Sequence, residues 1–78
     1  MPVLMLFAQA REAAGTSRAE VAGDTVGDVL TSARARFGPA FAAVLASSKV
    51  WVNGEPASEA DPVSASDEVA ILPPVSGG

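Results

Sequence analysis

The sequence predicts an α+β domain in which one main helix packs on one face of a mixed sheet. Two continuous apolar runs, residues 3–7 and 69–72, have the composition of buried central strands and lie near opposite ends of the chain. Between them, residues 25–37 carry apolar side chains at helical spacing. At 78 residues, the chain is limited to one domain.

The first half of the chain has clear signals for helix ends and turns. Residues 8–14 are helix-prone, and Gly15 is suited to a left-handed C-cap. Residues 18–22 alternate polar with apolar side chains, which is typical of a half-exposed edge strand. Thr25 is a good N-cap for the main helix, with Asp28 three residues later in a weaker form of the capping box.

The second half begins where Gly38 and Pro39 end the main helix. Apolar side chains at 41, 44 and 45 predict a short helical turn, and residues 49–53 predict a strand. Asn53-Gly54 is a strong hairpin-turn signal, after which residues 54–57 are expected to return as a short edge strand limited by Pro56. The predicted order is β-β-α-short helix-β-β-β.

Composition excludes several classes of function. The chain has no Cys and no His, so disulfides, serine triads, Cys-ligated metals and histidine-based zinc sites are impossible. We therefore expect no metal site and no self-contained enzyme. Nine acidic residues against five scattered basic ones give a net charge of −4, which argues against nucleic acid and anionic membranes. The same balance favours partners with basic surfaces.

The N-terminus has neither the length of a membrane span nor the pattern of a signal peptide. Residues 2–8 are apolar but too few to cross a bilayer, and they lack a basic leading segment and a cleavage site. A soluble, cytoplasmic protein is therefore the default expectation.

The last seven residues, 72–78, carry no charged side chain. Pro73 and Pro74 lack a backbone N–H, so a central strand cannot continue through them and the chain should leave the fold as a stiff stalk. The tip is Gly-Gly, which has no Cβ and fits a narrow slot. We accordingly divide the chain into a domain, 1–72, and an extended, flexible tail, 73–78, that presents its carboxylate. A frayed terminus without function is the alternative.

Three segments together resemble the small, sulfur-carrying subunit of molybdopterin synthase, the MoaD family of ubiquitin-like β-grasp proteins. They are Leu-Phe-Ala-Gln-Ala-Arg-Glu at 6–12, Val-Asn-Gly-Glu at 52–55, and Asp-Glu-Val-Ala running into Pro-Pro-Val-Ser-Gly-Gly at 67–78. The resemblance covers essentially the whole chain. It implies a β-grasp fold, with the first and last strands parallel and adjacent.

The resemblance also implies a reaction at Gly78. In this family an E1-like partner adenylates the C-terminal carboxylate with ATP and Mg²⁺, and a sulfur donor protein converts it to a thiocarboxylate. The tail, here Pro73, Pro74, Val75, Ser76 and Gly77, then inserts into the large synthase subunit, and the sulfur builds the dithiolene of molybdopterin. The complex contains two small and two large subunits. The carrier itself binds no cofactor and is not an enzyme.

Partner-docking residues follow from the resemblance and from strand alternation. If one set of alternate residues faces the helix, then Phe7, Trp51 and Leu72 face away and form an apolar patch at the root of the tail. Arg11 matches a family motif residue that pairs with a partner's acid; a local salt bridge is its alternative. Pro56 lies near an apolar contact of the family. Core packing under a loop is the alternative for the patch.

Acidic residues near the C-terminal end suggest a further contact with partners. Asp61, Asp67 and Glu68 would form an acidic rim that steers basic partners, or else be solvated surface charges.

Three other functions remain open on the sequence. A sulfur carrier for thiamin or cysteine synthesis would share the chemistry and differ in its acceptor. A ubiquitin-like modifier would form isopeptide-linked adducts. A plain β-grasp binding module would have no use for the Gly-Gly end.

Overall fold

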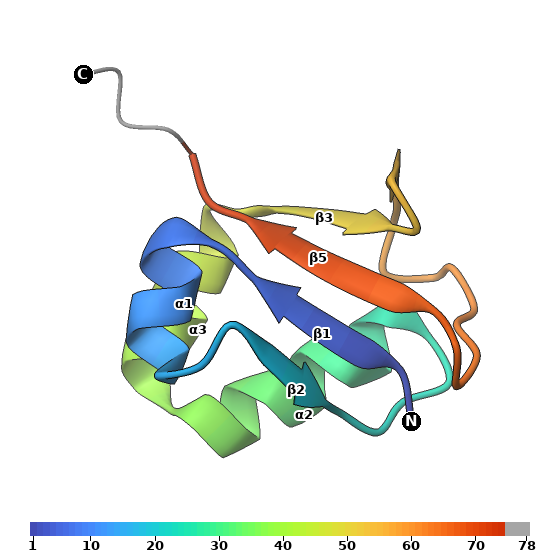
Figure 1. The fold of residues 1–78 in the computed structure, drawn as a ribbon, viewed down its shortest axis with the longest axis horizontal. Helices are drawn as coiled ribbons and strands as arrows, with labels where there is room; N and C mark the ends of the chain where they lie inside the picture. The colour runs from blue at the N-terminus through green and yellow to red at the C-terminus, as the bar shows by residue number, and fades with distance from the viewer. Residues whose placement is uncertain (75–78) are drawn as a thin grey trace.

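The computed structural model describes residues 1–74, in which a five-stranded sheet is covered on one face by helices (Figure 1). The elements, in chain order, are β1 (Val3–Leu6), α1 (Ala8–Ala14), β2 (Arg18–Glu20), α2 (Val26–Phe37), α3 (Pro39–Ala46), β3 (Lys49–Val52), β4 (Glu55–Pro56) and β5 (Glu68–Leu72). The strand order across the sheet is β2-β1-β5-β3-β4. The α+β, β-grasp prediction is confirmed.

The two central strands come from opposite ends of the chain. β1 and β5 run parallel, with Val3 opposite Glu68 and Leu6 opposite Ile71. β2 pairs antiparallel with the edge of β1 that faces away from β5, and β3 pairs antiparallel with the edge of β5 that faces away from β1. The continuous apolar runs therefore occupy the middle of a mixed sheet, where the strands have neighbours on both sides.

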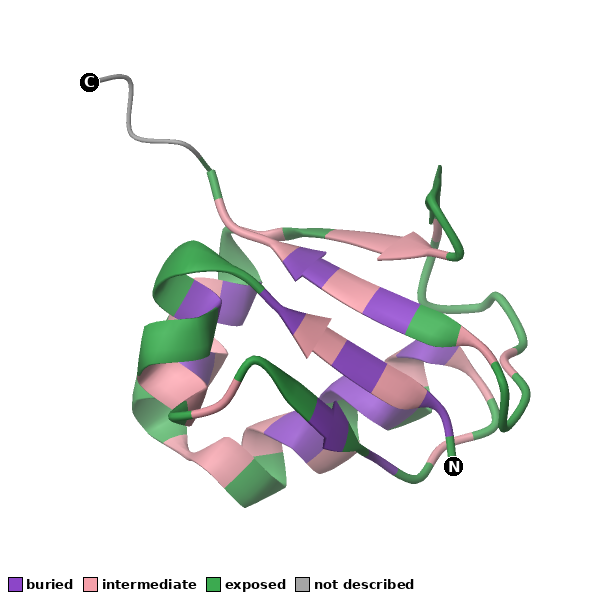
Figure 2. Cartoon of the chain, viewed as in Figure 1, coloured by how far each residue is buried: buried purple, intermediate pink, exposed green. Residues whose placement is uncertain are grey.

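Alternation along the strands separates a buried face from an uncovered one (Figure 2). Leu4 and Leu6 of β1, with Val69 and Ile71 of β5, are at most 1% exposed because α2 and α3 pack over them. We call this the inner face. The intervening residues point to the opposite, outer face and are only partly buried. The core is completed by these side chains: Ala10, Ala19, Val21, Val26, Val29, Leu30, Ala33, Phe41 and Leu45.

The main helix begins and ends at the predicted residues. The Thr25 Oγ1 accepts a hydrogen bond from the Asp28 N–H at 3.1 Å, and the Asp28 carboxylate accepts one from the Asp24 N–H at 3.3 Å. The helix ends at Gly38, whose φ of 90° is accessible to glycine and strained for other residues. Pro39 then begins α3, since proline is suited to the first helical turn.

One element differs from the prediction: the expected short turn after Pro39 is an eight-residue helix, α3. Residues 8–14 form the helix α1, which ends at Gly15 in the left-handed conformation, as their composition predicted. Phe41 explains the longer α3: its side chain is fully buried and its ring lies 5.2 Å from that of Phe37, so α3 closes one end of the core. Sequence spacing had indicated only a turn because this helix is rich in alanine.

The hairpin after β3 is built by its turn residues. Asn53 and Gly54 have φ values of 50° and 83°, as a two-residue hairpin turn requires. The Asn53 side chain also donates to Asp67 at 3.0 Å and accepts from the Glu68 N–H at 3.0 Å, which fastens the hairpin to the start of β5. No helix among residues 1–74 has the length and hydropathy needed to cross a bilayer.

Candidate docking face and tail root

The root of the tail lies at the centre of one end of the sheet. β5 ends at Leu72, and Pro73 and Pro74 follow directly, the first partly buried and the second exposed. Because β1 runs parallel beside β5, the chain end emerges next to Phe7 (Figure 1). The predicted tail residues Val75, Ser76, Gly77 and Gly78 lie outside the described residues, so their roles stay predictions, as does the division at residue 72.

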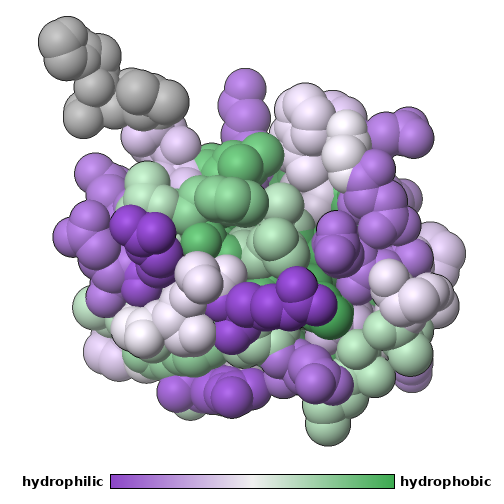
Figure 3. Space-filling model, in the orientation of Figure 1, coloured by the Kyte–Doolittle hydropathy of each residue, from purple (hydrophilic) through white to green (hydrophobic). Residues whose placement is uncertain are grey.

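A row of side chains crosses all five strands on the outer face. Arg18 lies opposite Met5, Met5 opposite Ala70, Ala70 opposite Trp51, and Trp51 opposite Pro56. Cross-strand neighbours in a sheet share a face, so four of these residues form a continuous apolar strip. No described helix covers it, and the space-filling view shows apolar side chains gathered over the central strands (Figure 3).

Phe7 extends this strip toward the tail. Its side chain is 43% exposed, which is unusual for so large an apolar group, because the chain leaves β1 here and turns at once into α1. The Phe7 carbonyl accepts from the Ala10 N–H at 3.0 Å, so its backbone is fixed as the N-cap of α1. This backbone hydrogen bond therefore fixes the position of Phe7, and its side chain stays at the surface.

The structure brings the predicted docking residues together around this surface. Phe7 and Leu72 flank the tail root, and Trp51 lies on the same face, as strand alternation predicted. Pro56, which was suggested by the family resemblance, lies opposite Trp51 at the far side of the strip. Arg11 is an exposed residue of α1, the helix that follows β1. The positions agree with a docking surface, while the roles themselves stay predictions.

The predicted acidic rim at the tail is wrong. Glu68 is the first residue of β5, four positions before Leu72, so it lies at the opposite end of the sheet. The Asp67 carboxylate accepts from the Ser64 N–H at 2.8 Å, and the Asp61 carboxylate accepts from the Ser58 N–H at 2.9 Å. Both acids stabilise turns. The Ser64 backbone hydrogen bond, followed by that from Asn53, lowers the pKa of Asp67 below its ordinary value of 3.8.

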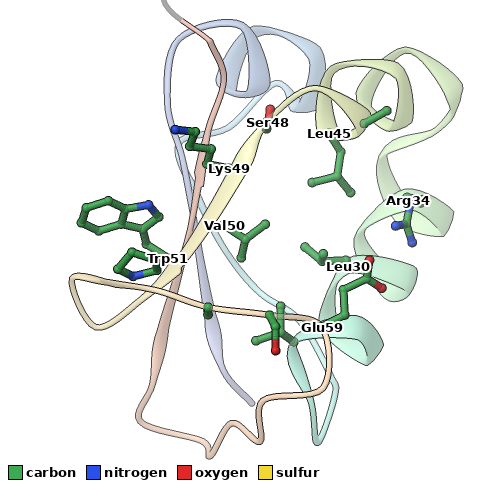
Figure 4. A pocket seen from close by; sticks show the side chains of 13 residues that line it. Leu30, Arg34, Leu45, Ser48, Lys49, Val50, Trp51 and Glu59 are labelled. Carbon is green, nitrogen blue, oxygen red and sulfur yellow. The ribbon is translucent and has the colours of Figure 1, made fainter.

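A groove that the sequence did not reveal lies on the other side of β3 (Figure 4). It has a volume of about 600 Å³ and is lined by apolar residues of α2, α3 and β3, with Leu30, Leu45 and Val50 facing it. Trp51 and Lys49 border it but project to the opposite side of the strand (Figure 4). Its rim carries both Arg34 and Glu59, so it has no single charge preference.

No three acidic side chains among residues 1–74 lie close enough together to hold a metal ion. What the arrangement does supply is an uncovered apolar surface with a chain end at its margin. This geometry is suited to presenting the C-terminus to another protein.

The comparison with known families agrees with this geometry. Residues 4–78 match the family model described as the ThiS family. The chain belongs to this family. Membership covers the sheet, the helices and the whole tail, which makes the chain a ubiquitin-like carrier by family.

Solved structures similar to the chain include two small archaeal modifier proteins. SAMP1 of Haloferax volcanii is 38% identical, with 99% of this chain and 98% of that one covered and a TM-score of 0.82. SAMP1 of Methanosarcina acetivorans is 34% identical, with 99% and 95% covered and a TM-score of 0.88. A Pyrococcus furiosus protein assigned as subunit 1 of the molybdopterin converting factor is 25% identical, with 95% and 97% covered and a TM-score of 0.83.

Proposed function

We propose that this chain is a carrier whose C-terminal carboxylate, on Gly78, is activated by an E1-like enzyme and then transferred to a nucleophile. The observation that carries the proposal is the position of the tail root, where Leu72 ends the central strand beside the uncovered apolar face. A partner that binds this face has the chain end at the margin of its contact surface. The family match, which includes the tail, supports the same function.

The reach of the tail fits such a partner. Six residues follow Leu72, and at roughly 3.3–3.6 Å per residue an extended chain spans about 20 Å. Two prolines at its start restrict the directions that the tail takes. Gly77 and Gly78 add no side-chain bulk, so the end can enter a narrow channel. Pro73 to Gly77 therefore serve as the inserted segment in this proposal.

The chemistry requires the partner's active site. A carboxylate is a poor electrophile, and attack of its oxygen on the α-phosphorus of ATP, with loss of pyrophosphate, converts it to an acyl adenylate. A nucleophile then attacks the acyl carbon and AMP leaves. ATP and Mg²⁺ are held by the partner, because this chain has no glycine-rich loop between a strand and a helix for nucleotide phosphates. The chain contributes only its end and the docking face.

The nucleophile decides between two fates. An amine gives an amide and makes the chain a protein modifier; a sulfur donor gives a thiocarboxylate and makes it a sulfur carrier. Similarity favours the first fate, since the modifiers are 38% and 34% identical and the molybdopterin protein is 25% identical. The finer prediction from the sequence, sulfur transfer within a molybdopterin synthase of two small and two large subunits, is the second candidate. The second candidate is supported by the similarity to the Pyrococcus furiosus molybdopterin protein and by the match to the ThiS family.

Lengthening the chain by one alanine after Gly78 tests the common step. The added residue moves the carboxylate away from the position that the partner's site must address, so adenylation should fall at least a hundredfold, with an unchanged unfolding midpoint. Mass spectrometry after incubation with the cognate E1-like enzyme, ATP and sulfide should show replacement of one oxygen by sulfur only in the unextended chain. Modification of the extended chain, without removal of the alanine, would overturn the proposal.

A second experiment separates the two fates. A tagged chain expressed in its own cells should form high-mass, isopeptide-linked conjugates if it is a modifier. The matched control lacks Gly77 and Gly78 and should form none. If no conjugates appear and the chain instead restores molybdenum-cofactor synthesis in a strain lacking its sulfur carrier, the second candidate is correct. If deletion of the two glycines leaves function intact, the chain is a plain binding module.

A further inference from the structure

Charged residues on the outer face are separated along the direction of the strands. At the end away from the tail, Val3 lies between Glu20 on β2 and Glu68 on β5. Both glutamates are exposed, and both share the outer face with Val3 because they are its direct cross-strand partners. This end of the docking face is therefore anionic.

The outer face carries cations nearer the tail. Lys49 lies opposite Leu72 at the tail root, and Arg18 lies opposite Met5, midway along the face at one edge of the apolar strip. Both side chains are exposed. In the described strands, no acidic residue lies level with Met5 or nearer the tail. The outer face is therefore anionic at the end away from the tail and cationic at Arg18 and Lys49, even though the chain as a whole carries −4.

The distance between Glu68 and the tail root is large enough for charged groups of a partner to interact with each end of the outer face separately. Glu68 and Leu72 are four residues apart on one strand, which corresponds to about 13 Å at roughly 3.3 Å per residue. The Debye length is about 8 Å at physiological ionic strength, so a group docked at one end is largely screened from charges at the other. The local charge, rather than the net charge, then determines attraction at each end.

We propose that the outer face binds a protein surface of complementary polarity, with acidic groups around the channel that accepts the tail and basic groups beneath Glu20 and Glu68. This inference rests on the proposed function. It reverses the expectation from net charge, in which the carrier meets a basic surface. The apolar strip supplies the contact area common to any orientation, and the charged ends select the orientation that places the tail at the channel.

Neutralising the two cations of the outer face, Arg18 and Lys49, tests the inference directly. The variant R18Q/K49Q removes two positive charges from the face, and its matched control, A35E/A43E, makes the same change in net charge on exposed positions of α2 and α3. Association with the cognate E1-like enzyme is measured by stopped flow at low and high salt. We expect R18Q/K49Q to associate about tenfold more slowly at low salt, the difference shrinking at high salt, and the control to change less than twofold.

The other end supplies the second arm. E20Q/E68Q should also slow association, although it makes the chain less negative overall. Faster association of R18Q/K49Q or E20Q/E68Q would show that a uniform surface charge on the partner steers binding and would overturn the inference. Rates equal to wild type in both variants would also overturn it. If wild-type chain is neither bound nor adenylated by the enzyme, the proposed function itself fails, and circular dichroism of each variant confirms that the fold is retained.

Discussion

The two faces of the sheet are made by the same strands and yet differ in what covers them. On the inner face, Leu6 and Ile71 are at most 1% exposed beneath the helices. On the outer face, the next residues along the same strands, Phe7 and Leu72, are exposed or only partly buried. Both faces carry large apolar side chains, so the presence of such side chains does not distinguish them. The difference is that, among residues 1–74, helices cover one face and leave the other uncovered.

This contrast identifies which apolar residues the fold does not need. A domain of this size has little stability to spare, so leaving large apolar groups on the surface is a cost unless another molecule covers them. The docking residues lie directly beside core residues in sequence. Substitution of neighbours should therefore separate folding from binding.

The largest effect is expected for the pair L6A and F7A. L6A removes a side chain from the core and should lower the free energy of unfolding by about 3 kcal/mol. F7A removes an exposed side chain and should cost less than about 1 kcal/mol, while weakening partner binding by at least tenfold. Urea denaturation and calorimetric titration with the E1-like enzyme measure the two quantities. Equal stability losses for the two variants would remove the distinction between the faces.

A smaller effect is expected in the fluorescence of Trp51, the single tryptophan of the chain. Trp51 lies partly buried in the apolar strip, so a docked partner should exclude water from its ring. Its emission should move to shorter wavelength, and its quenching by acrylamide should fall severalfold in the complex. The variant F7A, at the same partner concentration, serves as the control with less complex. An unchanged spectrum in a saturated complex would remove Trp51 from the docking surface.

The smallest effect concerns Asp67, whose hydrogen bonds belong to a turn far from the tail. Its folded-state pKa lies below the unfolded value, so its ionised form stabilises the fold above the unfolded pKa, and this stability is lost as the pH falls through the folded pKa. D67N should therefore slightly lower the melting temperature at pH 7 and flatten the decline of stability below about pH 4. Adenylation at neutral pH should stay unchanged. Loss of adenylation in folded D67N would place this end of the sheet in the chemistry.

Most of the fold could be predicted because local signals agree with the tertiary structure. The Thr25 cap, the Gly15 and Gly38 helix ends and the Asn53-Gly54 turn each have the conformation that their residue type favours. The extra helix α3 was underestimated because its alanines give a weak periodicity, and burial of Phe41 became evident only in the folded chain.

The docking strip was partly predictable, since alternation places Phe7, Trp51 and Leu72 on one face once the helix side is chosen. The charge separation was not, because it depends on the register between strands. Glu68 is near the tail in sequence but lies at the other end of the sheet, whereas Lys49 is distant in sequence and lies directly opposite Leu72. The pairing register of β3 with β5 determines where Glu68 and Lys49 lie, and this register cannot be read from the sequence.

The parallel pairing of β1 with β5 also has a consequence for biosynthesis. Val3 pairs with Glu68, so the first strand made by the ribosome waits for the last before the sheet can close. A chain that stops early lacks β5, and with it Ala70 and Leu72 of the candidate docking face. Under the proposed function, a partner that requires this face therefore activates only chains in which the sheet has closed.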